Sequence, residues 1–223
     1  MQTLLAVILF AAALPASNIE TAPRHSSGNT TPTAMDALLH ANLQAHGLVP
    51  AVVCSDEVFF RRVHLDLLGM LPEPQEVLAF LRDTQPDKRA RCIDALLCSD
   101  EFSEYWSMKW CDLLRVKAEF PINLWPNAVQ AYHRWIRDAL QSNMPYDAFA
   151  RALLTSSGSN FHAPPVNFYR AVQGKDSAAI AAAVGLTFMG TRLDAWPDQQ
   201  RAAMAVFFSR LTFKETDEWK EEI

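Results

Sequence analysis

Residues 55–117 constrain the fold of this chain most strongly, because their large apolar residues recur at helical spacing between residues that begin and end helices. Ser55 is a suitable N-cap, since its hydroxyl can accept a hydrogen bond from a backbone N–H of the first turn. Gly69 can adopt the left-handed conformation that ends a helix. These signals predict a helix from about Asp56 to Leu68 with one wide apolar face.

Three further helices are expected in the same stretch. Pro74 is tolerated in the first turn of a helix that runs to about Arg82, and Pro86 can open another that runs to about Leu97. The longest helix follows, and its expected core-facing apolar residues are Phe102, Tyr105, Trp106, Trp110, Leu113 and Leu114, after an N-cap at Ser99. Short helices in close succession, each apolar on one face, predict a core built from antiparallel neighbours.

The same periodicity continues on both sides of this stretch. Amphipathic helices are expected at residues 33–46, 126–141, 145–154, 177–189 and 198–211. The buried face of the last one is expected to consist of Met204, Phe207, Phe208 and Leu211. Residues 156–169 (SSGSNFHAPPVNFY) interrupt the periodicity, which predicts an ordered proline-rich loop that crosses the helical body. The predicted fold class is all-α, a compact domain of many short antiparallel helices.

The N-terminal end differs from the rest in composition. Residues 4–16 are an apolar run that is too short for a membrane-spanning helix of about 20 residues and fits a cleaved signal peptide over residues 1–16. The alternative is a buried N-terminal helix. Residues 17–32 are rich in Ser, Thr, Asn and Pro, as flexible linkers are. One helical domain is expected over residues 33–223, in an exported periplasmic or cell-surface protein with no membrane span after cleavage.

Charge and cysteine usage narrow the classes of function. The formal net charge is −5 with acidic and basic residues interspersed, so no basic stripe can neutralise a phosphate backbone and no nucleic-acid partner is expected. The four cysteines are Cys54, Cys92, Cys98 and Cys111. None lies in a CxxC motif, and no metal site is expected. Buried free thiols are favoured, but disulfides stay possible in an oxidising compartment.

Several segments, in order along the chain, resemble a known family. They are FFRRVHLDLLGMLPEPQEVLAFL, DKRARCIDALL, MPYDAFARALL, PPVNFYRAV, GLTFMGTRL and AVFFSRL, and the resemblance covers residues 52–223. The chain resembles the planctomycete-type cytochrome-associated domain (domain of unknown function 1549), which is found in large exported multidomain proteins. The resemblance implies a fold but little about function, because the family's own activity is poorly defined.

The resemblance also identifies a missing segment. In relatives, the segment that corresponds to residues 191–196 is longer and contains a CxxCH motif followed by His-Pro, the pattern that attaches a c-type haem covalently. Here the chain reads TRLDAWPDQQ, and no CxxCH occurs elsewhere. The chain therefore resembles a haem-less variant, and no covalent haem c or other cofactor is expected. Residues 191–197 are expected to close two helices that pack as an antiparallel pair.

No catalytic residue can be assigned from the sequence. Three serines of residues 156–159 precede His162, but no GxSxG nucleophile elbow is present. The carboxylates are dispersed, and no HExxH motif or phosphate-binding loop occurs. Asp66 is expected to pair with an arginine at a helix interface, with Arg62 one turn away, rather than to act as an acid.

Two functions are compatible with these patterns. The first is a non-catalytic structural or protein-interaction domain of an exported protein, whose partner is an unidentified protein or a component of the cell envelope. The second is a redox or ligand-binding domain that holds a cofactor or small ligand non-covalently, with His162, Tyr169 and Trp196 as candidate binding residues. A Soret band that persists after gel filtration would favour the second function.

Overall fold

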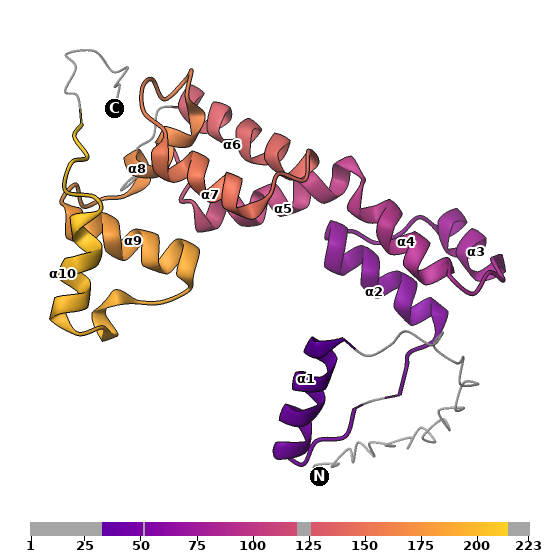
Figure 1. Cartoon of the computed structure of the whole chain (residues 1–223). Coiled ribbons are helices and arrows are strands. Elements are labelled where there is room, and N and C mark those ends of the chain that lie inside the picture. The colour runs from indigo at the N-terminus through magenta and orange to yellow at the C-terminus, as the bar shows by residue number, and fades with distance from the viewer. Residues whose placement is uncertain (1–32, 51, 120–125, 214–223) are drawn as a thin grey trace, which may run out of the picture. The chain divides into compact units, whose positions relative to one another are not determined.

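The computed structural model describes residues 33–50, 52–119 and 126–213, and the expected signal peptide and linker lie outside the described residues. Within these ranges every regular element is helical, which confirms the all-α class (Figure 1). The elements are α1 (Ala34–Ala45), α2 (Asp56–Leu68), α3 (Pro74–Arg82), α4 (Lys88–Leu97), α5 (Asp100–Leu113), α6 (Pro126–Gln141), α7 (Tyr146–Thr155), the 3-10 helix η1 (Pro164–Val166), α8 (Asn167–Ala171), α9 (Ser177–Met189), the 3-10 helix η2 (Leu193–Ala195) and α10 (Asp198–Val206). No helix in the described ranges is long and apolar enough to cross a membrane.

The chain divides into two compact units, residues 1–55 and 56–223, and α1 belongs to the first. The ends of α1 are stabilised locally. The Thr33 hydroxyl accepts a hydrogen bond from the Asp36 N–H (3.2 Å), the Asp36 carboxylate accepts one from the Thr33 N–H (2.7 Å), and Gly47 ends the helix with φ of 65°. None of the residues of α1 is buried. The expectation of one domain over residues 33–223 stays a prediction.

In the larger unit, α2 packs against α3, α4 and α5. Phe60 is buried in this contact and stacks on Phe80 of α3, with ring centroids 4.4 Å apart. Ion pairs join the first turns of α2 and α4, since the Asp56 carboxylate lies 2.6 Å from Nζ of Lys88 and 2.6 Å from Nη2 of Arg89. The aromatic contact between α2 and α3 and the ion pairs between α2 and α4 together fix these three helices.

The expected ion pair of Asp66 is absent. Asp66 is exposed, and nowhere in the described ranges does it pair with Arg62 or another arginine. The interface position in this part of α2 belongs instead to His64, which is buried and has Nδ1 2.9 Å from the Phe60 carbonyl oxygen. At this position α2 therefore has a buried imidazole that bonds to its own helix, and not an ion pair.

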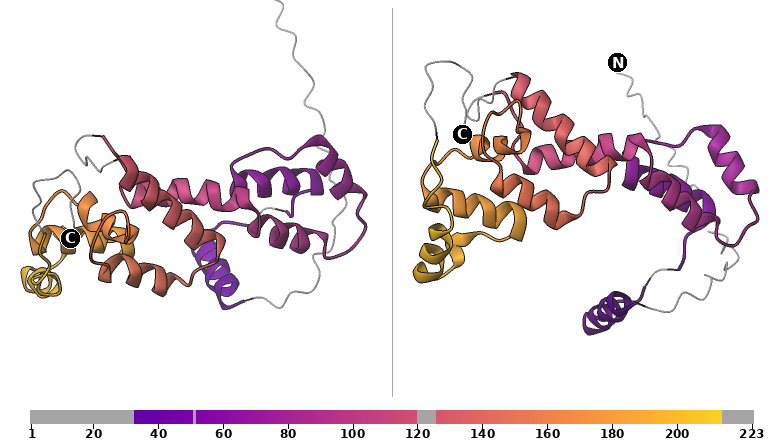
Figure 2. Two further views of the ribbon diagram at one scale, coloured as in Figure 1. Left: turned by 90° about the horizontal axis from the view of Figure 1, so that it is seen from above. Right: turned by 45° about the horizontal axis from the view of Figure 1, so that its top comes forward.

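The most extensive helix contact is between α5 and α6, which lie side by side in every view (Figures 1 and 2). The fully buried residues of α5 itself are Ser103 and Ser107, because small side chains allow two helices to approach closely. The expected core face of α5 is therefore only partly correct. Trp106 and Trp110 are half-buried, and Leu113 is 53% exposed.

The main core lies among α6, α7, α8 and α9. Its fully buried large side chains include Tyr132, Ile136, Leu153, Phe168 and Ile180. The expected proline-rich loop of residues 156–169 is ordered, but it is shorter than predicted because η1 and the first turn of α8 form inside it. The Asn167 side chain fixes this segment by donating to the carbonyl oxygens of Asn160 and Pro164, each at 2.9 Å.

α9 and α10 pack together as expected, but α10 crosses α9 rather than running antiparallel to it (Figures 1 and 2). The connection returns along α9 because Leu193 is buried against Gly185, where a Cβ atom would lie 2.8 Å from the leucine side chain. The last helix also ends at Val206 and not near residue 211. Phe207, expected in its buried face, is 82% exposed.

Candidate functional site

An open cavity of about 500 Å³ lies between the C-terminal end of α2 and the N-terminal part of α5, and its surface is mostly apolar. The apolar residues that line it are Leu68, Gly69, Met70, Tyr105 and Met108. The remaining lining residues are the carboxylates Asp100, Glu101 and Glu104. We call this cavity, defined by these eight residues, the α2–α5 groove.

The turn after α2 shapes the groove. Gly69 has φ of +69°, and a Cβ atom there would lie 2.3 Å from Cε2 of Tyr105, so both the backbone conformation and the available space require glycine. The next residue of α5, Trp106, donates from Nε1 to the Leu67 carbonyl oxygen at 3.1 Å. Two adjacent aromatic side chains of α5 therefore fix the end of α2, and one of them, Tyr105, lines the groove.

Two methionines form the part of the groove that faces solvent. Met70 is 49% exposed and Met108 is 53% exposed, and Leu71, next to Met70, is 61% exposed. The unbranched, polarisable methionine side chain adapts to irregular apolar surfaces and is frequent at binding surfaces. Neighbouring exposed apolar residues are typical of a site that binds another molecule.

The carboxylates of the groove are only partly neutralised. Asp100 accepts a hydrogen bond from Nε2 of Gln141 (2.6 Å), and Glu104 forms an ion pair with Nη1 of Arg137 (3.1 Å). Glu101 has no ion pair within the part of the chain that the structure describes. The groove therefore combines an apolar lining with a negatively charged edge.

The model of PSCyt2, a family described as "Protein of unknown function (DUF1549)", matches residues 34–212. This chain belongs to the PSCyt2 family. The match extends the resemblance noted for residues 52–223 toward the N-terminus, so α1 is part of the PSCyt2 domain. No curated protein and no solved structure matches the chain.

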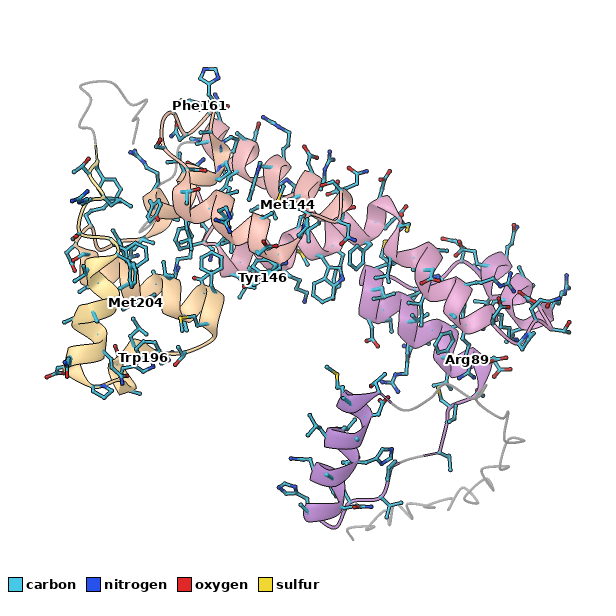
Figure 3. All side chains as sticks on the ribbon, in the orientation of Figure 1. Arg89, Met144, Tyr146, Phe161, Trp196 and Met204 are labelled. Carbon is cyan, nitrogen blue, oxygen red and sulfur yellow. The ribbon has the colours of Figure 1, made fainter. Side chains whose placement is uncertain are left out.

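The binding residues suggested by the sequence do not converge in this PSCyt2 domain. His162 is exposed and Trp196 is half-buried. Phe161, the neighbour of His162, lies far from Trp196 in Figure 3. Tyr169 is 2% exposed, and its hydroxyl donates to the Leu154 carbonyl oxygen at 2.7 Å. Its role is therefore in the core, where burial raises the pKa of its hydroxyl.

A serine–histidine contact that sequence reasoning missed joins α5 to α6. The Ser107 hydroxyl lies 3.4 Å from Nε2 of His133 and donates to the Glu104 carbonyl oxygen at 2.8 Å. Ser107 is fully buried, so no substrate can reach its oxygen. Twenty-six residues separate the pair in sequence, and only the close approach of the two helices brings them together. The contact positions α5 beside α6 and is not a nucleophilic site.

Two of the four thiols, those of Cys92 and Cys111, are partly buried and poorly reactive. All four cysteines are free, and burial raises the pKa of Cys92 and, with a smaller effect from Asp112, raises that of Cys111 to about 11. A raised pKa suppresses the thiolate, which is the nucleophilic form and the metal-binding form. The described ranges also contain no group of three or more His, Cys, Asp or Glu side chains that could hold a metal ion.

The groove supplies apolar surface, adaptable methionines and carboxylates, which suit contact with another molecule. Sequence periodicity could not identify the groove, because its walls come from α2, from α5 and from the turn that follows α2. The available signal was weaker: Met70 and Leu71 directly follow a helix-ending glycine, where polar residues are more usual.

Proposed function

We propose that this PSCyt2 domain is a non-catalytic protein-interaction module of an exported protein and that the α2–α5 groove is its binding surface. The observation that carries the proposal is an open, mostly apolar cavity in which two methionines stay half exposed. Water-exposed apolar surface of this kind is unfavourable unless a partner covers it, and it commonly marks interaction sites. An unidentified protein, or another component of the cell envelope, is the expected occupant.

The module is haem-less. We expect the attachment segment of relatives to correspond to the connection between α9 and α10, where this chain has no cysteine. The four cysteines lie elsewhere, and none is followed by histidine. In the shortened connection, Leu193 packs directly on Gly185. The residues present do not fit a covalent c-type haem, so the proposed function uses none.

Expression with a cytochrome c maturation system tests this part of the proposal. We expect no peroxidase-active staining of the denatured polypeptide and no Soret band after gel filtration. Staining of the denatured chain would contradict the haem-less proposal. A Soret band that denaturation abolishes would support the alternative function, a domain that holds a cofactor non-covalently.

Export of the module is supported by the short apolar run of residues 4–16 and the polar segment that follows it. The mature protein is expected in the periplasm or at the cell surface, starting after residue 16. Mass spectrometry of the N-terminal peptide from envelope and cytoplasmic fractions tests this expectation. A cytoplasmic chain that retains residues 1–16 would contradict it.

Site-specific photocrosslinking in cells tests the interaction itself. A photoreactive benzoylphenylalanine in place of Met108, in the groove, is expected to give a discrete crosslinked product. The same group in place of Arg151, which is exposed on α7, serves as the control and is expected to give none. Equal crosslinking at both positions, or no product from Met108, would contradict the proposed binding surface.

A further inference from the structure

We infer that the occupant of the α2–α5 groove is a cationic amphipathic helix of a partner protein. Its apolar side chains would enter the groove, and its lysines or arginines would lie beside the groove carboxylates. The inference rests on the function proposed above and adds the chemistry of the partner.

The exposure of the groove favours a helix over an enclosed small ligand. Small-molecule sites bury most of the ligand surface, whereas Met70 and Met108 leave this cavity open to solvent. A helix that lies across an open groove needs to bury only one face. Its apolar side chains at positions i, i+3 or i+4, and i+7 would then contact the methionines and the Tyr105 ring.

The position of the carboxylates favours positive charge on that helix. Asp100, Glu104 and Met108 are spaced four residues apart in α5, so the carboxylates and the exposed methionine share one helical face. The helix dipole accounts for acidic residues in the first turn, Asp100 and Glu101. Glu104 lies beyond that turn, and like charges at i and i+4 are unfavourable in an isolated helix. A cationic partner would offset this repulsion.

The basic side chains nearby leave this edge negative. Arg137 is the ion-pair partner of Glu104 but also lies 3.1 Å from Asp138, so its charge is shared. The Lys109 ammonium lies 5.0 Å from the centre of the Tyr105 ring. Glu101 stays without an ion pair in the described ranges. Charge complementarity across an interface selects partners by sign, so acidic helices and anionic membrane surfaces are disfavoured.

Two synthetic peptides test the inference on the full chain. One is a 14-residue amphipathic leucine–lysine helix, and the other has glutamate at every lysine position. The protein carries ¹³C in its methionine methyl groups, and NMR titration reports on each methionine separately. We expect the lysine peptide to shift the Met70 and Met108 signals, while Met144, Met189 and Met204 stay unchanged. The glutamate peptide is expected to bind about tenfold more weakly or not at all.

A matched pair of charge variants tests the role of the groove edge. Glu101→Lys is expected to weaken binding of the lysine peptide by about tenfold, because it replaces attraction with repulsion. Asp147→Lys makes the same charge change at an exposed residue of α7 and is expected to change affinity less than about twofold. Equal effects of the two variants would contradict a local contribution of Glu101.

The remaining outcomes distinguish this inference from the proposed function. Equal binding of both peptides, or shifts confined to Met144, Met189 or Met204, would overturn the cationic occupant of the groove. Absence of any shift with either peptide would overturn it as well. If crosslinking at Met108 still gave a discrete product in cells, the interaction function would stand and only the assigned partner chemistry would be wrong.

Discussion

The α2–α5 end of the larger unit and the core around α6–α9 are stabilised in different ways. Of the buried apolar residues in the described part of the chain, three lie in residues 56–113 and eighteen in residues 114–119 and 126–193. At the α2–α5 end, charged groups contribute instead. Lys88 and Arg89 pair with Asp56, and their cationic groups also lie over aromatic rings, at 4.8 Å and 4.7 Å from the ring centres.

This difference explains how one small domain can keep an apolar groove open. Burial of apolar surface stabilises the α6–α9 core, and that core leaves few large side chains available for a partner. Ion pairs and cation–π contacts fix helices while covering less apolar surface than a packed core does. The α2–α5 end therefore retains exposed methionines and leucines on a defined backbone, as a binding surface requires.

The largest expected effect concerns the core around α6–α9. Phe168→Ala removes a fully buried ring that lies 5.4 Å from the Phe188 ring, and it should lower the free energy of unfolding by about 3–5 kcal/mol. Met108→Ala, at an exposed groove position, should change it by less than about 0.5 kcal/mol. Denaturant unfolding of both variants measures the contrast. Similar losses would show that the groove is part of the core.

The second effect tests how firmly the groove wall is positioned. Gly69→Ala should lower the free energy of unfolding more than Gly47→Ala, although both glycines have positive φ. Only a Cβ atom at Gly69 would contact an aromatic ring. The backbone conformation alone costs about 1 kcal/mol at either site, and the contact with Tyr105 should add about 1–3 kcal/mol at Gly69. The double variant Gly69→Ala/Tyr105→Ala tests the cause, since the added cost should disappear in it. If it persisted, another contact would be responsible.

The sequence predicted most of the helices because each signal that defines them is local. The ranges 56–68, 74–82, 126–141 and 177–189 agree with the structure at both ends. Caps, helix-ending glycines and apolar spacing all act within a few residues. No knowledge of the neighbouring helices is needed to recognise them.

Features that depend on two helices were not predictable in this way. Apolar spacing places Trp106 and Trp110 on a core face, but the close contact of α5 with α6 instead buries Ser103 and Ser107. Periodicity likewise extends the last helix through Phe207, which is exposed. The groove is a further feature that depends on two helices, because its walls depend on how α2 packs against α5.

The third prediction concerns the charged cluster at the α2–α5 end. Burial raises the pKa of Asp56, but hydrogen bonds and charge from Lys88 and Arg89 outweigh it, so the pKa is below its ordinary value. The unfolded chain therefore binds the proton more tightly, and this stabilisation is present above about pH 4 and is lost as the pH falls through the lower folded pKa. The expected contribution is about 1 kcal/mol.

Urea unfolding between pH 2 and pH 6 measures this contribution. The Asp56→Asn variant keeps the shape of the side chain but removes its charge, so it should be less stable than the parent at pH 6 and nearly as stable at pH 2. A variant whose deficit is the same at both pH values would show that Asp56 acts through shape or helix capping, and the ionic account of the α2–α5 end would be wrong.

The smallest effect leaves the free energy of unfolding unchanged and compares two thiols, one exposed at the α2–α5 end and one packed against the core. Cys98 at the end of α4 is exposed, whereas Cys111 packs against the core and has its pKa raised to about 11 from 9.0. At pH 8 that shift lowers the thiolate fraction of Cys111 by about a hundredfold, and burial also restricts access of the reagent. Iodoacetamide labelling of the native protein, followed by mass spectrometry, should therefore modify Cys98 long before Cys111.

Labelling in urea is the control, because unfolding should make the two rates similar. Rapid native labelling of Cys111 would show that the core opens near α5, and the contrast between an open binding surface and a closed core would then be wrong.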